Sequence, residues 1–326
     1  MRNARKYDIV ALGELLIDFI PVGESDSQNP VYEANPGGAP GNVLAMAEKY
    51  GRHTAFIGKI GDDVHGTFLK ETVENAGIDT SGLIVTEIYN TTLAFVSIDA
   101  HGERSFSFYR NPGADMTLTV DEVKKELIEN ARIFHFGTLS MTHDTVKKAT
   151  KYAVEIAKEQ GCLISFDPNL RPLLWNDLND AKEQMLYGVS VCDVLKIEED
   201  ELRFMTGIED IYEAVQYLRD HFHVKLILVT AGAKGCEAFW NQQHIKQEAF
   251  LTEKTIDTTG AGDTFFGYCL ACLIDFDIDA LEPVQVVRML QGASAASSIV
   301  TTRKGAMKSM PEMGEVERLL KERGCR

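Results

Sequence analysis

Short apolar runs alternate with longer amphipathic stretches along most of the chain. Runs such as YDIVALG (7–13) and VKLILVT (224–230) are rich in β-branched residues and predict buried strands. The stretches between them predict helices, and two of these end at Gly51 and Gly77. This alternation is typical of a mostly parallel sheet with helices on both faces, whose ligands bind beyond the carboxyl ends of the strands. The further predicted strands are 53–61, 131–137, 162–167 and 192–197, and the predicted helices are 41–51, 64–77, 144–161, 198–207 and 264–274.

Two regions interrupt this rhythm. Residues 15–35 and 81–110 are strand-like, with no helix within either region. The segment TTLAFVSIDAHGERSFSFYR (91–110) predicts a hairpin with its turn at DAHG (99–102). We expect the two regions to form a small antiparallel lid over the α/β body. Because no repeat, low-complexity tract or linker divides the chain, we expect one domain over residues 1–326.

Composition narrows the class of protein. The 326 residues are 44% hydrophobic and 25% charged, which is typical of a globular protein with a large core. A net charge of −16 argues against nonspecific binding of nucleic acid. Acidic residues interrupt the apolar N-terminal segment, so we interpret it as a strand rather than a signal peptide, and no apolar run has the length of a membrane span. We therefore expect a cytoplasmic protein that binds neither nucleic acid nor membrane.

The spacing of the cysteines and histidines gives little indication of a metal site. Six cysteines are scattered along the chain, which is typical of reduced thiols in the cytosol. Cys269 and Cys272 form a CxxC, but it lies in an apolar predicted helix without a second such pair, so we interpret both as core residues. The HFH at 221–223 stands alone, and we do not expect it to hold a metal.

The stretch DTTGAGDTF (257–265) carries the strongest chemical signal. Gly260, Ala261 and Gly262 precede an apolar predicted helix, and N–H groups at a helix start attract anions. Asp263 would repel an anion but could accept a proton from the group that attacks it. The alternative is an ordinary glycine turn with an acid in the first helical turn, where the helix dipole stabilises it. This stretch alone leaves the two interpretations about equal.

Two other loops have the composition of ligand sites. In PGGAPGN (36–42), Gly37 and Gly38 permit a close approach, and Asn42 can both donate and accept hydrogen bonds. A plain strand-to-helix loop is the alternative. In LVTAGAKGC (228–236), polar and glycine positions follow a buried strand, where nucleotides sit in α/β folds. Neither a Walker A motif nor GxGxxG occurs, so P-loop and Rossmann interpretations lose support.

Taken together, these motifs resemble those of the ribokinase-type (PfkB) carbohydrate kinases, over essentially the whole chain. GKIGDDVHG (58–66) is similar to the family's N-terminal signature and DTTGAGDTF to its highly specific C-terminal one. PGGAPGN, FYRNPGAD (108–115) and FDPNLRPLLW (166–175) resemble the fructokinase branch. The resemblance implies a ribokinase-like three-layer α/β/α fold, with a mostly parallel central sheet and a small β-sheet lid. It also implies ATP-dependent phosphorylation of a sugar hydroxyl.

The resemblance implies roles for individual residues. Asp263 matches the catalytic base, and the amides of 260–262 match the anion hole. The expected sugar and phosphate contacts are Asp18, Gly37, Gly38, Asn42, Arg110 and Arg171. The expected ATP contacts are Lys196, Thr230, Gly232, Gly235 and Ser294.

The resemblance also implies two cations. Glu201 matches the glutamate of the family's NxxE element, which orders Mg²⁺ and phosphate through water, although the asparagine of that element falls on Glu198. The segment VTTRKGAMKS (300–309) is similar to one that helps to bind a monovalent cation, expected to be K⁺. The expected contacts of this ion are Asp257, Thr259, Val300, Arg303, Gly305 and Ser309.

The resemblance favours fructokinase activity, the conversion of D-fructose and ATP to D-fructose 6-phosphate and ADP. A 2-keto-3-deoxygluconate kinase shares both arginine positions, which would then face a substrate carboxylate. Another PfkB-type sugar kinase remains an alternative. A non-catalytic sugar-binding protein is disfavoured because Asp263 and the GAGD sequence are intact. Exposed edges of the lid predict a homodimer through it.

Overall fold

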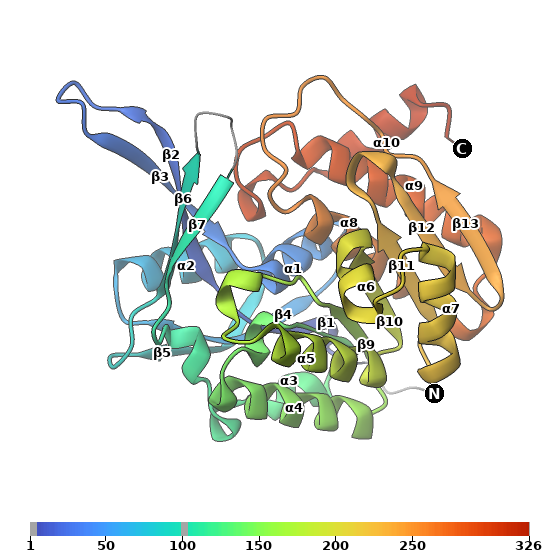
Figure 1. Ribbon diagram of the computed structural model, residues 1–326, viewed down its shortest axis with the longest axis horizontal. Coiled ribbons are helices and arrows are strands. Elements are labelled where there is room, and N and C mark those ends of the chain that lie inside the picture. The colour runs from blue at the N-terminus through green and yellow to red at the C-terminus, as the bar shows by residue number, and fades with distance from the viewer. Residues whose placement is uncertain (1–4, 99–103, 326) are drawn as a thin grey trace.

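The computed structural model describes residues 5–98 and 104–325. A nine-stranded sheet runs through its centre in the order β13-β12-β11-β10-β9-β8-β1-β4-β5 (Figure 1). All neighbours pair in parallel except β11 with β12 and β12 with β13, which are antiparallel. The strands are β1 Tyr7–Leu12, β4 Thr54–Gly61, β5 Asp79–Thr86, β8 Ala131–Gly137, β9 Leu163–Asp167, β10 Val194–Glu198, β11 Leu226–Thr230, β12 Cys236–Trp240 and β13 Gln243–Gln247.

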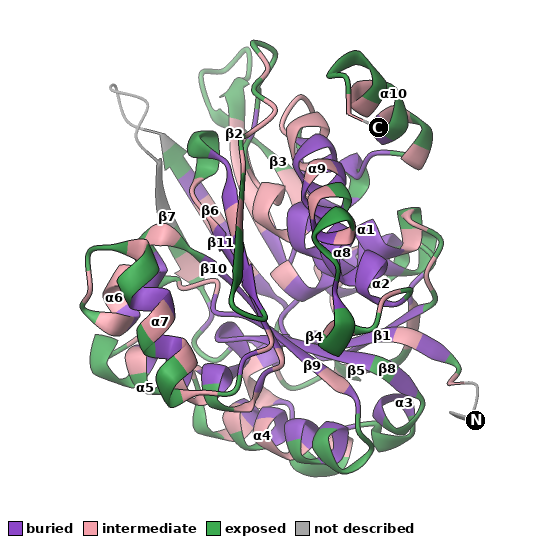
Figure 2. Cartoon of the chain, turned by 90° about the vertical axis from the view of Figure 1, so that its right-hand side faces the viewer, coloured by how far each residue is buried: buried purple, intermediate pink, exposed green. Residues whose placement is uncertain are grey.

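Helices cover both faces of this sheet, so the expected three-layer α/β/α fold is confirmed. One face packs against α1 Ala39–Lys49, α2 Val64–Asn75, α8 Ala261–Leu273, α9 Pro283–Val300 and α10 Met313–Glu322. The other face packs against α3 Lys125–Glu129, α4 Asp144–Glu159, α5 Leu178–Val191, α6 Glu199–Thr206 and α7 Ile211–His221. Figure 2 shows buried residues concentrated between these layers.

The strand sequences explain the two apolar cores. In β11, Leu226 and Leu228 face the first set of helices, whereas Ile227 and Val229 face the second. Successive side chains of a strand point to opposite faces of the sheet, so a continuous apolar run can fill both cores at once. No helix in the described part of the chain is long and apolar enough to cross a membrane.

The lid is a separate four-stranded sheet in the order β3-β2-β6-β7. The expected antiparallel pairing holds within each hairpin, but β2 and β6 pair in parallel, so the lid is a mixed sheet. Its strands are β2 Leu16–Glu24, β3 Pro30–Gly37, β6 Thr92–Ile98 and β7 Arg104–Tyr109. They project from one end of the body in Figure 1. The expected hairpin of β6 and β7 is antiparallel, and its expected turn at 99–102 lies outside the described residues.

The expected lid range of 81–110 begins too early. Residues 81–86 belong to β5, which pairs in parallel with β4 at the edge of the large sheet. Alternation of apolar and polar residues marks a strand with one buried face, but it does not say which sheet the strand joins. The second part of the lid is therefore built from residues 92–98 and 104–109.

Candidate active site

A tight turn at Gly260 opens helix α8 and presents Asp263 in the first helical turn. Gly260 has φ of 76°, in the left-handed region, and a Cβ there would lie 2.5 Å from Cβ of Ala306. A Cβ on Gly262 would lie 3.1 Å from Nζ of Lys196, so the glycine lets a cationic side chain approach the turn. The Ala261 amide donates to the carbonyl oxygen of Thr258 at 3.2 Å, so an anion at this amide would compete with a turn hydrogen bond.

A hydrogen bond connects this turn to the other glycine loop. Asn42 Nδ2 donates to Asp263 Oδ2 at 2.8 Å. Asn42 lies in the first turn of α1, whose N-terminal residue is preceded by Gly38 with φ of 129°. The Oδ1 atom of Asn42 is buried and has no hydrogen-bond partner among the described residues. Buried polar atoms are rarely left unpaired, so this oxygen is positioned to accept from a ligand hydroxyl.

Burial raises the pKa of Asp263 to about 6. Asp167 raises it as well, whereas the Asn42 hydrogen bond and the cations Lys196 and Arg171 lower it. Burial likewise raises the pKa of Asp18 to about 6, although Arg171 opposes this shift. A carboxylate with a pKa just below neutrality is charged at pH 7 and still able to hold a proton, which suits a general base.

Asp263 borders a cavity of about 470 Å³ between the body and the lid. The lid contributes Asp18 of β2, and Gly37 lies so close that a Cβ there would be 2.6 Å from Asp18 Oδ2. The cavity thus brings together most of the expected sugar contacts, namely Asp18, Gly37, Gly38, Asn42 and Arg171. Apolar side chains complete its walls, including Leu16, Ile20, Val96, Phe108 and Leu139.

A second cavity, of about 420 Å³, lies on the other side of the same turn. Four expected ATP contacts line it, namely Thr230, Gly232, Gly235 and Ser294. The Oγ1 atom of Thr230 is buried without a partner among the described residues. The two cavities share Glu198, Thr258 and Gly262 as lining residues. A group bound in one cavity can therefore reach a group bound in the other beside Asp263.

Lys196, expected at ATP, instead lines the first cavity. Its Nζ forms an ion pair with Oδ2 of Asp167 at 3.0 Å, and both side chains are almost fully buried. Burial alone would lower the pKa of Lys196, but the surrounding carboxylates, led by that of Asp167, outweigh it and raise the pKa. The lysine thus keeps its positive charge beside the turn at Gly262.

Glu201, expected to order Mg²⁺ through water, does not line either cavity, and its role toward Mg²⁺ stays a prediction. Its two carboxylate oxygens accept hydrogen bonds from the amides of Leu170 (2.6 Å) and Glu198 (3.0 Å). The second bond belongs to a capping box that begins α6. The exposed Glu198, in the place of the expected asparagine, lines both cavities instead.

The two expected arginines lie in different environments. Arg171 is exposed and lines the first cavity. Arg110 is buried and does not line that cavity, and its guanidinium is hydrogen-bonded to Asp115, Thr142 and the carbonyl oxygen of Leu139. The structure therefore does not bring the two guanidiniums together as a clamp.

The residues expected to hold K⁺ come from two adjoining segments. The amides of Ile256 and Asp257 donate to the carbonyl oxygen of Thr301, which joins 256–259 to the end of α9. Asp257 is buried, and its Oδ1 accepts from the amide (3.0 Å) and hydroxyl (2.7 Å) of Thr259. Val300, Gly305 and Ser309 lie in the second segment, where Arg303 donates to the Ser309 carbonyl at 3.3 Å. This proximity fits the expected cation site, whose ligands stay a prediction.

Sequence reasoning missed three acidic residues of the site. Asp167 pairs with Lys196, Glu198 lies at the junction, and Glu14 is a buried residue of the first cavity. Asp167 and Glu198 are the last residues of β9 and β10. Polar residues at the carboxyl ends of parallel strands are a signal that could have found these two.

Comparison with known proteins agrees with this arrangement. Residues 6–313 match the model of the pfkB family carbohydrate kinases. Fructokinase-1 of Zea mays is 40% identical over 316 residues, covering 96% of this chain and 98% of the relative. A fructokinase of Xylella fastidiosa, solved with bound ATP, is 31% identical with a TM-score of 0.89, covering 97% of this chain and 99% of that one.

A fructokinase double mutant of Vibrio cholerae O395, solved in a form with fructose, ADP and potassium ion bound, is 29% identical. Its TM-score is 0.86, and the match covers 98% of this chain and 100% of that one. The family match spans nearly the whole chain, and the glycine turn lies where the two cavities meet, with Asp263 and the lid bordering one of them. The chain therefore belongs to the PfkB family of carbohydrate kinases.

Proposed function

We propose that this carbohydrate kinase is a fructokinase, which transfers the γ-phosphoryl group of ATP to D-fructose and forms D-fructose 6-phosphate and ADP. The observation that carries the proposal is the meeting of two cavities at Gly262, beside Asp263. One cavity lies between the lid and the body and has hydroxyl-binding groups, and the other is lined by the expected nucleotide loop. The fructokinases among its relatives support the choice of fructose.

In this mechanism, the sugar lies in the lid cavity with its hydroxyl groups on Asp18 and Asn42. The oxygen of the reacting hydroxyl attacks the γ-phosphorus of ATP, and the bond from this phosphorus to the bridging oxygen breaks. ADP leaves with that electron pair, and Asp263 accepts the hydroxyl proton. The start of α8 and the charge of Lys196 stabilise the oxygens of the transferring group.

We propose Glu198, rather than Glu201, as the acidic residue nearest to Mg²⁺. Mg²⁺ takes oxygen ligands and usually binds through one or two carboxylates together with substrate phosphates. Glu198 lines both cavities, whereas the carboxylate of Glu201 is engaged by two backbone amides. Bound Mg²⁺ would neutralise charge on the ATP phosphates.

The alternative of a 2-keto-3-deoxygluconate kinase loses its main support. It requires two guanidiniums near the substrate carboxylate, and Arg110 is occupied by other protein groups. Of the two arginines, only Arg171 lines the cavity, and Lys196 is the other cationic residue of the lining. The acids of the lining are Glu14, Asp18, Glu198 and Asp263. A sugar acid would bring a further negative charge to these four acids, which disfavours it.

Dimerisation and location stay predictions. On the lid, Phe19, Tyr32 and Tyr109 each pack against Phe95, and the Tyr109 side chain is 66% exposed. A second copy of the chain that covers these rings would explain why an aromatic cluster is exposed on the lid, and sedimentation velocity would detect the dimer.

The six free thiols fit the expected cytoplasmic location.

A panel of sugars tests the proposed substrate. We expect kcat/KM for D-fructose to exceed that for 2-keto-3-deoxygluconate by at least about tenfold, because like charges across a binding site are strongly disfavoured. Asp18→Ala should raise KM for fructose much more than KM for ATP. A coupled assay for ADP, with product identification, measures both. A preference for the keto-deoxy acid would overturn the fructokinase proposal and leave the kinase class intact.

Removal of the carboxylate tests the role of Asp263. Asp263→Asn should bind ATP normally and lower kcat by about 10²- to 10⁴-fold, the usual effect of losing a positioned general base. The matched control is Asp79→Asn, which alters a hydrogen-bonded acid at the far edge of the sheet and should keep full activity. Turnover by folded Asp263→Asn within a few-fold of the parent would show that another group accepts the proton.

Exchange of monovalent salts tests the cation. The segments 256–259 and 300–309 adjoin the turn that begins α8, so an ion between them would shape the anion site without touching the sugar. We therefore expect higher kcat in KCl than in NaCl or tetramethylammonium chloride at equal ionic strength. Equal rates in the three salts would exclude a functional cation there.

A further inference from the structure

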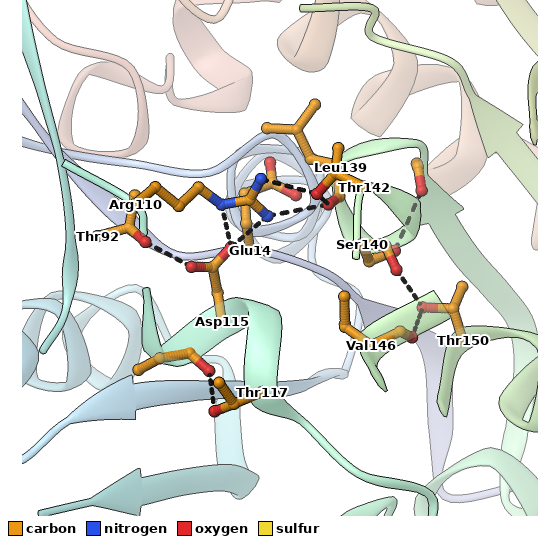
Figure 3. A network of polar contacts seen from close by, with 12 residues as sticks. Glu14, Thr92, Arg110, Asp115, Thr117, Leu139, Ser140, Thr142, Val146 and Thr150 are labelled. Carbon is orange, nitrogen blue, oxygen red and sulfur yellow. Dashed lines mark hydrogen bonds and ion pairs between the residues drawn. The ribbon is translucent and has the colours of Figure 1, made fainter. Parts of the chain in front are cut away.

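Arg110 is hydrogen-bonded to three residues from two other parts of the protein (Figure 3). It follows directly after β7, and its side chain is almost completely buried. Nε donates to Asp115 Oδ2 at 2.8 Å, Nη1 to Thr142 Oγ1 at 2.8 Å, and Nη2 to the carbonyl oxygen of Leu139 at 2.9 Å. One guanidinium thus joins the end of a lid strand to two short 3-10 helices of the body, Ala114–Thr117 and Leu139–Met141.

The carboxylate of Asp115 binds the second lid strand. Its Oδ1 accepts a hydrogen bond from the hydroxyl of Thr92, the first residue of β6. Thr92 is also the pairing partner of Leu16 at the start of β2. The body ends of β6 and β7 are therefore held by the two oxygens of one buried carboxylate.

The residues joined in this way belong to the walls of the sugar cavity. Phe108 of β7 lies two positions before Arg110, and Val96 belongs to β6. Both line the cavity, and so does Leu139, whose carbonyl oxygen accepts from Arg110. The ion pair thus connects the apolar wall supplied by the lid with the apolar wall supplied by the body.

A third group extends the cluster to the glycine loop. Glu14 is 3% exposed, lines the cavity, and accepts a hydrogen bond from the amide of Ala39 at 2.9 Å. Ala39 begins α1, which carries Asn42. Figure 3 shows Glu14 beside the guanidinium of Arg110. Burial raises the pKa of Glu14 to about 7, and the positive charge of Arg110 opposes this rise. The buried cluster therefore reaches from the lid strands to α1, whose Asn42 donates a hydrogen bond to Asp263.

Stability alone is a poor explanation for such a pair. The cost of removing two charges from water offsets much of their attraction, and apolar replacements often stabilise a protein as well. What a buried, fully hydrogen-bonded pair supplies is a defined geometry. Here that geometry fixes the position of the lid strands relative to the cavity.

We propose that the Arg110–Asp115 pair is a positioning device for the lid, which acts through Phe108 and Leu139 rather than by contact with the sugar. It holds β6 and β7 so that these walls close over the sugar and exclude water from the transferring phosphoryl group. This inference rests on the proposed kinase activity. It differs from the role that the family resemblance implies, in which Arg110 lies near the sugar.

The test uses Arg110→Lys, Asp115→Asn and Thr92→Val in the full chain. Each variant should raise KM for fructose by about tenfold or more, because an imperfectly placed lid weakens sugar binding, while KM for ATP stays within about twofold. The ratio of ATP hydrolysis to sugar phosphorylation should rise, since water then competes with the sugar. Hydrogen exchange of residues 92–98 and 104–109 should accelerate in the same variants.

Lys59→Met is the matched control. Lys59 is 8% exposed and pairs at 2.7 Å with Glu122, whose side chain is 28% exposed. This partly buried ion pair joins β4 to the 3-10 helix Val120–Glu122 within the body and binds no lid strand. This variant should lower the melting temperature and leave KM for fructose, the hydrolysis ratio and exchange in the lid unchanged. If Lys59→Met and Asp115→Asn changed KM for fructose and exchange in the lid equally, a general loss of stability would explain both, and the proposal would be wrong.

Another outcome would restore a direct sugar contact. If Arg110→Lys raised KM for fructose while Asp115→Asn and Thr92→Val did not, Arg110 would act on the sugar itself and the proposal would be wrong. Failure of the parent to phosphorylate fructose would instead reject the fructokinase assignment. The same comparisons would then use the sugar that the parent accepts, and the exchange measurement needs no substrate.

Discussion

The hydrogen bond from Asn42 to Asp263 is the contact on which the site depends. It joins two residues that are 221 positions apart and connects the first turn of α1 to the first turn of α8. The two helices pack against each other along the same face of the sheet. Their N-terminal turns therefore meet at one place, where the glycine loop, the acid and the shared wall of the two cavities come together. The glycine loop, the acid and the shared wall form a site for the reaction only when they lie together.

Charge balance within the site follows from burial. The protein carries a net charge of −16, so its overall field repels ATP, and attraction must come from local groups. Lys196 supplies a buried positive charge that Asp167 keeps in place, and the start of α8 adds oriented backbone dipoles. Burial raises the pKa values of Asp263 and Asp18. The lid strand β2 carries Asp18 into the sugar cavity, so the lid contributes to the proton chemistry there.

Much of this could be predicted from sequence, because strand and helix periodicity and glycine turns are local properties. The glycine turn before α8 and the loop before α1 were both recognisable from residues within a few positions of each other. Arg110 was different, since its environment depends on Leu139 and Thr142, which lie 29 and 32 positions away. Similarly, the capping box of α6 turns Glu201 toward backbone amides, and a motif position does not reveal where a carboxylate points. The environments of these two side chains depend on residues that are distant in the sequence.

The most direct test of this account is the pH dependence of kcat/KM for fructose, measured from about pH 5 to 8 for the parent and for Asn42→Ala. A base acts only when deprotonated, so activity of the parent should rise with pH through about 6, the pKa of Asp263, and then level off. The Asn42 hydrogen bond lowers that pKa, so its loss should move the acid limb to higher pH, which separates Asp263 from Asp18 and Glu14. A parent profile that stays flat down to pH 5, or an acid limb that does not move in Asn42→Ala, would contradict the account.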